Sequence, residues 1–141
     1  MSEEFVPPPE KIKEILTSNK VVAIVGLSDN KMRPSHRIGM FLKARGYEVI
    51  PVNPAYENVL GLKSYKNLLE IPKQIDIVDI FRKPETVGPI VDEAIQKKAK
   101  VVWLQEGVIN IDAARKAMDA GLIVVMDRCM FKEYAKLLMG R

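Results

Sequence analysis

The feature that most limits the fold of this chain is a series of five short apolar segments rich in valine and isoleucine. They occupy residues 21–25, 49–52, 75–81, 101–104 and 122–126, and apolar and polar positions scarcely alternate within them. Strands without alternation are typical of a parallel sheet that is covered on both faces. The sequence therefore predicts a parallel sheet of about five strands.

Segments with helical spacing separate these strands. Apolar side chains between residues 87 and 95 follow an i, i+3, i+4, i+7, i+8 pattern, which indicates a helix with one apolar face. Similar patterns predict further helices over 9–18, 38–45, 111–118 and 130–138. Asn110 is a plausible N-cap for the helix that follows it. The connection 53–72 has little periodicity and is predicted to be a loop with a brief helix at 67–70.

Each strand is followed by room for one crossover connection. The apolar segments begin at residues 21, 49, 75, 101 and 122, so successive intervals are 28, 26, 26 and 21 residues. This spacing predicts one doubly wound, Rossmann-like α/β domain over 1–141 with helices on both faces, in which 1–19 forms an N-terminal helical extension. Ligands of such folds bind at the carboxyl ends of the strands, where the strand order reverses.

Composition excludes several classes of function. The chain has 22 Lys and Arg against 18 Asp and Glu, a net charge of +4, with the two signs interspersed. That balance suits an anionic small molecule at least as well as nucleic acid, and no basic and aromatic residues interleave as in a base-stacking face. No apolar run approaches the roughly 20 residues of a membrane span, and no secretory signal is evident, so a cytoplasmic protein is expected. Because the chain has a single cysteine and a single histidine, we expect no internal disulfide and no Cys/His metal site.

The loop after the first strand has the chemistry of an anion-binding loop. Its glycine, hydroxyls and cations are Gly26, Ser28, Lys31, Arg33, Ser35 and Arg37. Glycine allows close backbone approach, and hydroxyls and N–H groups at the start of a helix bind phosphate oxygens. The loop matches neither the G-x-G-x-x-G fingerprint nor a Walker A loop, so an ordinary polar loop is an equal alternative.

The next two strand ends add to this picture. The second strand ends in Asn53 and Pro54 without the acidic residue that holds the ribose of NAD, which disfavours NAD. The third strand is followed by Phe81, Arg82 and Lys83, an aromatic ring and two cations where a helix begins. Solvated charges at a strand exit are the simpler interpretation, but the same residues complement a polyphosphate at the first loop.

The last two strand ends carry carboxylates and the cysteine. Glu106 and Asp127 are candidate acid or base residues, although a role as helix N-cap partners or in ion pairs with Arg82 and Arg128 is more ordinary. His36 lacks a carboxylate in its own loop and is expected to act at the helix start or on a ligand. Cys129 is a reactive thiol if Arg128 favours its thiolate, and otherwise an inert, buried one.

Several of these segments together resemble a known family. They are Val25-Gly26-Leu27-Ser28 with Arg33-Pro34-Ser35, Gly46-Tyr47, Ile50-Pro51-Val52-Asn53-Pro54, Val78-Asp79-Ile80-Phe81-Arg82, Val102 to Val108, and Val125 to Cys129. The chain resembles the small CoA-binding proteins, whose domain is similar to the N-terminal CoA-binding domain of the succinyl-CoA synthetase alpha subunit. The resemblance runs from about Val21 to the C-terminus.

The resemblance implies roles for individual residues. Gly26 and Ser28 would approach the CoA diphosphate, with Arg33, Pro34 and Ser35 beside it. Lys31, Arg33 and Arg37 would have the 3′-phosphate as a target. The adenosine would be bordered by Val52, Asn53 and Pro54, and the pantetheine and phosphate path lined by Phe81, Arg82 and Lys83. The expected CoA-binding set is completed by Leu27, Gln105, Glu106, Gly107 and Cys129.

The leading interpretation is a protein that binds CoA or an acyl-CoA without catalytic residues of its own. The phosphorylated histidine of the synthetases belongs to a second domain to which nothing in this chain corresponds, so thioester synthesis by this chain alone is not expected. One alternative is a small nucleotide-dependent oxidoreductase or acyl-CoA-processing enzyme that uses Glu106, Asp127 or Cys129. Another is a regulatory or scaffolding subunit that forms a homo-oligomer or joins a partner subunit.

Overall fold

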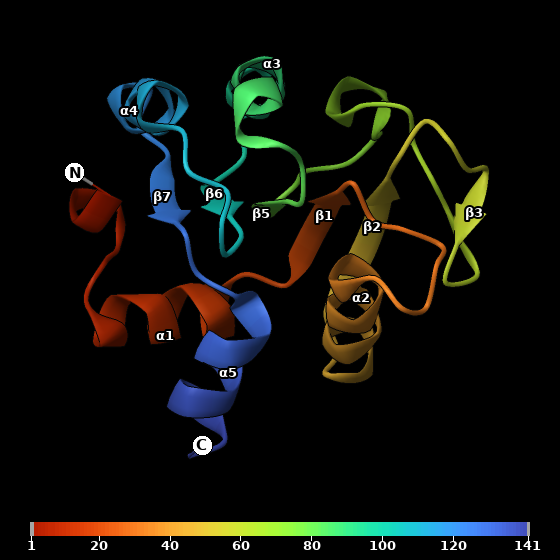
Figure 1. Ribbon diagram of the computed structural model, residues 1–141, viewed down its shortest axis with the longest axis horizontal. Helices are drawn as coiled ribbons and strands as arrows, with labels where there is room; N and C mark the ends of the chain where they lie inside the picture. Colours follow the sequence, from red (N-terminus) through yellow and green to blue (C-terminus); the bar gives the residue numbers. More distant parts are fainter. Residues whose placement is uncertain (1, 141) are drawn as a thin grey trace.

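The computed structural model describes residues 2–140 and contains a five-stranded parallel sheet (Figure 1). The strand order is β2-β1-β5-β6-β7, and every neighbouring pair is parallel. The strands are β1 (Val21–Val25), β2 (Glu48–Val52), β5 (Ile77–Ile80), β6 (Val101–Leu104) and β7 (Ile123–Met126). Nearly every strand residue is buried, which confirms the sheet predicted from the unbroken apolar segments.

Helices cover both faces of the sheet, as predicted for a doubly wound α/β fold (Figure 1). One face carries α1 (Pro9–Ser18), α2 (Pro34–Ala44) and α5 (Met130–Leu138), and the other carries α3 (Val87–Gln96) and α4 (Ile111–Asp119). The apolar stripe predicted between residues 87 and 95 is the buried side of α3. Because successive strand residues point to opposite faces, the sheet divides the core into two clusters.

The N-terminal segment packs on both of these clusters. A single turn of 3-10 helix, η1 (Ser2–Phe5), places Phe5 in the cluster beneath α3 and α4, where its side chain is fully buried. The apolar side of α1 packs in the opposite cluster. Within the predicted extension 1–19, η1 and α1 are helical and residues 6–8 between them are not, and residue 1 lies outside the described residues.

The connection between β2 and β5 is more structured than predicted. The brief helix expected at 67–70 is confirmed as the 3-10 turn η2 (Leu68–Glu70), capped by the side chain of Asn67. Ahead of it lies an unpredicted antiparallel hairpin of β3 (Asn58–Val59) and β4 (Leu62–Lys63). Strands of two residues are too short to show a period-2 pattern, which is why the sequence pattern did not reveal them.

The strand order determines where a ligand can enter. From β1 the chain winds in one direction to β2, and then crosses back to β5 on the other side of β1. The connections that leave β1 and β5 therefore diverge, which opens a crevice at the carboxyl edge of the sheet. No helix among the described residues is long and apolar enough to cross a membrane.

Candidate functional site

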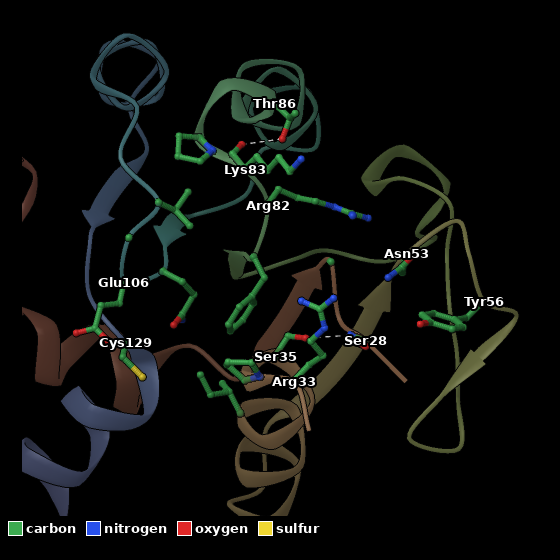
Figure 2. Close-up of a pocket in the computed structure, with 18 residues that line it drawn as sticks. Ser28, Arg33, Ser35, Asn53, Tyr56, Arg82, Lys83, Thr86, Glu106 and Cys129 are labelled. Atoms are coloured by element: carbon green, nitrogen blue, oxygen red, sulfur yellow. Dashed lines mark hydrogen bonds between the residues drawn. The ribbon is translucent and has the colours of Figure 1, made fainter. Parts of the chain in front are cut away.

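A cleft of about 780 Å³ lies at the carboxyl edge of the sheet (Figure 2). It is lined by the segments that follow β1, β2, β5 and β6 and by the residue before α5. In Figure 2, Asn53 and Tyr56 lie at one end of the cleft and Glu106 and Cys129 at the other, with Ser28 and Arg33 between them. Volumes of this size are typical of sites that hold small organic ligands.

Most of the predicted site residues line this cleft. They are Gly26, Ser28, Arg33, Pro34, Ser35, Asn53, Phe81, Arg82, Lys83, Gln105, Glu106, Gly107 and Cys129. The others do not line it: the side chains of Leu27 and Val52 are buried in the two core clusters, and Lys31 and Pro54 are exposed. Arg37 lies instead beside a neighbouring groove.

The cleft also contains residues that the sequence did not point to. These are Ile38, Tyr56, Pro84, Thr86 and Val108. Ile38 belonged to an apolar helical pattern that predicted core burial alone, whereas Tyr56 lies in the connection without periodicity. Nothing in the local pattern distinguished either residue from its neighbours.

Gly26 joins three strands at the floor of the cleft. Its φ is +89°, and a Cβ atom at this position would lie 2.3 Å from the carbonyl oxygen of Phe81. Its N–H donates to the carbonyl of Val52 at 2.8 Å. Glycine is therefore required by the close approach of the β1 and β5 ends, a reason that is independent of any ligand.

The loop after Gly26 is built by side chains that bind its own backbone. The N–H of Ser28 donates to Ser35 Oγ, and the N–H of Asn30 donates to Ser28 Oγ, both at 3.0 Å. His36 Nδ1 lies 2.9 Å from the carbonyl oxygen of Ser28. The N–H groups of Ser28 and Asn30 are therefore already bonded within the loop. The two hydroxyl oxygens act as acceptors here, so their hydrogens remain able to donate to an anion.

His36 supports this loop from within α2. The ring is buried and contacts the Ser28 carbonyl, and His36 does not line the cleft. The expected role at the start of the helix is confirmed, and a role as a general base finds no support in this position.

The cations on the walls of the cleft lack carboxylate partners. Arg33 lies on one side and Arg82 and Lys83 on the other (Figure 2). Among the described residues, no carboxylate lies within 4.0 Å of any of the three. Their charges are therefore available to a negatively charged ligand.

The predicted ion pairs of Glu106 and Asp127 with arginine are wrong. Glu106 pairs with Lys132, with Oε1 and Nζ 2.9 Å apart, and this pair raises the pKa of Lys132. Asp127 Oδ1 accepts the N–H of Gly107 at 2.8 Å, while Arg128 donates to the backbone carbonyl of Asp127. The carboxylate of Asp127 thus holds the turn after β6 in place, and the positive charge across the cleft is not neutralised.

Asn53 holds the β2 end against the glycine loop. Its Nδ2 donates to the carbonyl of Leu27 at 3.1 Å, and its Oδ1 accepts the N–H of Ala55 at 3.0 Å. Both side-chain polar atoms are therefore occupied. Asn53 shapes the wall of the cleft, and the neighbouring ring of Tyr56 supplies a flat apolar surface there.

Cys129 lies at the other end of the cleft. It is the residue before α5 and is half-buried. Burial raises the pKa of this thiol and outweighs the N–H groups of Lys132 and Phe131, which favour the thiolate. The suggestion that Arg128 activates Cys129 is therefore not supported.

Behind this end of the cleft lies a buried carboxyl group that the sequence did not single out. Asp79 in β5 is completely buried, and Gln105 Nε2 donates to its Oδ1 at 2.7 Å. Its Oδ2 has no hydrogen-bond partner among the described residues. Burial raises the pKa of Asp79 to about 7, while the bond from Gln105 acts in the opposite direction. No group of three potential metal ligands occurs among the described residues.

Comparison with known proteins connects this site to a family. Residues 20–135 match a family described as "CoA binding domain". The chain is 40% identical over 124 residues to the uncharacterized protein YneT of Bacillus subtilis (strain 168), covering 88% of this chain and 92% of that protein. It is similar to a solved hypothetical protein from Pyrococcus horikoshii OT3, with 46% identity, a TM-score of 0.92, and coverage of 94% and 93% of the two chains.

A longer enzyme contains a similar segment. The 4-hydroxybutyrate–CoA ligase (ADP-forming) of Nitrosopumilus maritimus (strain SCM1) is 33% identical over 106 residues, which are 74% of this chain but 14% of that protein. The present chain thus corresponds to a small part of the ligase and to nearly the whole length of YneT. The chain belongs to the CoA binding domain family.

Proposed function

We propose that this protein binds CoA or an acyl-CoA in the cleft at the carboxyl edge of the sheet, without catalysing a reaction of its own. The observation that carries the proposal is the set of unpaired cations, Arg33 facing Arg82 and Lys83, in a cleft of ligand size. CoA carries a diphosphate and a 3′-phosphate, so two anionic groups would meet these cations. Membership of the CoA binding domain family supports the same ligand.

In this proposal the ligand lies along the cleft. The adenosine contacts the end formed by Asn53 and Tyr56, and the diphosphate lies over Gly26 and the Ser28 hydroxyl. The pantetheine passes Phe81 toward Glu106 and Cys129. The order of these residues along the cleft in Figure 2 supports this direction.

Within the loop after β1, Arg33 is the best candidate to bind a phosphate. Lys31 and Arg37 were also expected to face the 3′-phosphate, but neither lines the cleft. Backbone hydrogen bonds order the loop around Arg33, whose N–H donates to the carbonyl of Asn30 at 3.0 Å. An ordered loop loses less conformational entropy when a ligand binds.

Absence of catalysis is proposed because the candidate groups have structural roles. Glu106 is paired with Lys132, and Asp127 accepts a backbone N–H. The thiol of Cys129 has a raised pKa. No two of these groups form a nucleophile and base in hydrogen-bond contact among the described residues.

Isothermal titration calorimetry with CoA and dephospho-CoA tests the proposal. Arg82→Ala is expected to weaken both ligands by about 10- to 100-fold, since a hydrogen bond to a charged group contributes about 1.5–3 kcal/mol. Arg33→Ala is expected to weaken CoA more than dephospho-CoA if Arg33 binds the 3′-phosphate. Equal losses for the two ligands would place Arg33 on the diphosphate instead.

Arg45→Ala is the matched control, because it removes the same charge at the opposite end of α2. Binding of both ligands is expected to be unchanged in this variant. Absence of any heat of binding for CoA and short acyl-CoAs at millimolar ligand would refute the proposed function.

A further inference from the structure

A second hollow adjoins the cleft on the α2 and α5 side of the sheet. This α2–α5 groove has a volume of about 660 Å³. Its apolar lining comes from Pro34, Ile38, Met40, Phe41 and Phe131. The charged side chains Arg37, Glu106 and Lys132 also border it, and Glu106 and Lys132 neutralise each other.

The groove shares part of its lining with the cleft. Pro34, Ile38, Glu106 and Cys129 line both hollows, so the two hollows adjoin at the Cys129 end of the cleft. The cations Arg82 and Lys83 line only the cleft, whereas the side chains of Met40, Phe41 and Phe131 line only the groove. The lining is therefore more apolar on the groove side of Cys129.

The wall of the groove is built by packed aromatic rings. The rings of Phe41 and Phe131 meet edge to face, with centroids 4.7 Å apart, and Phe41 also packs edge to face on Tyr134 at 5.3 Å. Such contacts hold the rings in position without a ligand. Even so, Met40 and Phe131 remain 54% and 40% exposed, so this apolar surface is open to solvent.

We propose that the α2–α5 groove receives an apolar acyl group attached to the thiol of bound CoA, so that the preferred ligand is a neutral acyl-CoA of medium chain length. This inference rests on the proposed function, which puts the thiol of CoA beside Cys129. A substituent on that thiol has the groove as its continuation. An apolar chain gains free energy there by covering Met40 and Phe131.

The volume of the α2–α5 groove favours an acyl chain as its occupant over a second copy of the protein. A volume of about 660 Å³ lies within the range of ligand sites, and the groove shares four lining residues with the cleft. Contact with a second copy does not require that shared lining. Self-association is nevertheless an outcome that the experiment below distinguishes.

The test compares CoA with S-octyl-CoA, a thioether that cannot be hydrolysed, by calorimetry. Each fully buried methylene strengthens binding by about fourfold. Because the groove is open on one side, we expect S-octyl-CoA to bind the wild-type protein at least about tenfold more tightly than CoA.

Substitutions in the groove test whether the octyl chain binds there. Phe131→Ala and Met40→Ala are each expected to remove most of the advantage of S-octyl-CoA and to leave the affinity for CoA within about twofold, because neither side chain lines the cleft. Met118→Ala is the matched control, since Met118 is an exposed methionine of α4 on the other face of the sheet. This variant is expected to keep the full preference for S-octyl-CoA.

Each contrary result has a separate meaning. If CoA binds but the octyl chain adds nothing, or adds the same in all variants, the groove assignment is overturned while CoA binding stands. If neither ligand binds, the proposed function itself fails. Sedimentation that detects a dimer dissociated by Phe131→Ala would assign the groove to a second copy and overturn the inference.

Discussion

At the scale of single residues, Gly26 has two roles: it allows the ends of β1 and β5 to pack closely, and it lines the cleft. The glycine is fixed by the carbonyl of Phe81 on one side and by its own positive φ. Both neighbouring segments line the cleft. A larger residue here would move the two segments apart, and the geometry of the whole cleft depends on their close approach.

Gly26→Ala is expected to lower the free energy of unfolding by about 2 kcal/mol or more, because a clash with backbone adds to the strain of positive φ. Gly46→Ala is the matched control. Gly46 also has a positive φ, +92°, but no atom lies within 4 Å of the added methyl group. Urea unfolding should give a loss of only about 1 kcal/mol for Gly46→Ala. Equal losses in the two variants would contradict the role assigned to the Phe81 contact.

Asp79 gives stability a distinctive dependence on pH. The pKa of Asp79 in the folded protein is about 7, against 3.8 for an unperturbed aspartate, so between those pH values the folded state binds more protons than the unfolded state. The contribution of Asp79 to stability is complete below about pH 4 and is lost as the pH rises through about 7. This loss amounts to at most about 4 kcal/mol.

Asp79→Asn should therefore stabilise the protein more at pH 8 than at pH 5, because the amide has no charge to bury and keeps an oxygen for Gln105. Urea unfolding at the two pH values measures the difference. Asp119→Asn, at the exposed end of α4, is the control and should leave the free energy of unfolding unchanged at both pH values. An identical effect of Asp79→Asn at both pH values would contradict the assigned titration.

At the scale of elements, the start of α5 brings Cys129 to the meeting point of the cleft and the groove. If the CoA thiol lies there, oxidised CoA should modify Cys129. The thiolate of Cys129 attacks one sulfur of the CoA disulfide and the S–S bond breaks, so that a protein–CoA disulfide forms and the second CoA leaves as a thiolate, which takes a proton from water. Because the pKa of Cys129 is raised, the reaction should be slow at pH 7 and faster at pH 9.

Intact mass measures this adduct over time. Cys129→Ser is expected to give no adduct, and an excess of S-octyl-CoA, which has no free thiol, should slow the reaction of the wild-type protein. A Cys129 that stays unmodified at pH 9, while CoA still binds, would place the thiol of the ligand elsewhere.

Elements with a strong hydrophobic period were predictable, and elements that depend on distant contacts were not. Continuous apolar segments predicted the strands, and an apolar pattern with a period of 3.6 residues predicted α3. Asn110 was likewise identifiable as an N-cap, and its Oδ1 accepts the N–H of Ala113 at 3.0 Å. The β3–β4 hairpin has strands of only two residues, and Tyr65, which follows it, pairs with Val52 of β2, a contact that no local pattern reveals.

At the scale of the whole molecule, the edge of the sheet that carries the site was predictable because parallel strands share a direction. The residues that follow the strands meet at one edge whatever the strand order. The contacts among them were not predictable in the same way. The bond from Gln105 to Asp79 depends on the register of β5 and β6, and the pairing of Glu106 with Lys132 depends on where α5 begins.

The same reasoning explains which predicted residues fell outside the cleft. Leu27 and Val52 are adjacent to cleft residues in sequence, but their side chains point into the two core clusters. Lys31 lies on an exposed turn of the loop. Sequence proximity to a strand end therefore identified the segments of the site, while side-chain direction selected the residues within them.

We propose that the cationic cleft over Gly26 holds CoA with its thiol toward Cys129, and a crystal structure of the protein grown with CoA would show this arrangement. The diphosphate is expected between the Ser28 loop and Arg82, and the thiol at the mouth of the α2–α5 groove. CoA bound at the amino-terminal edge of the sheet, or lying in the cleft with its adenosine beside Cys129, would contradict it.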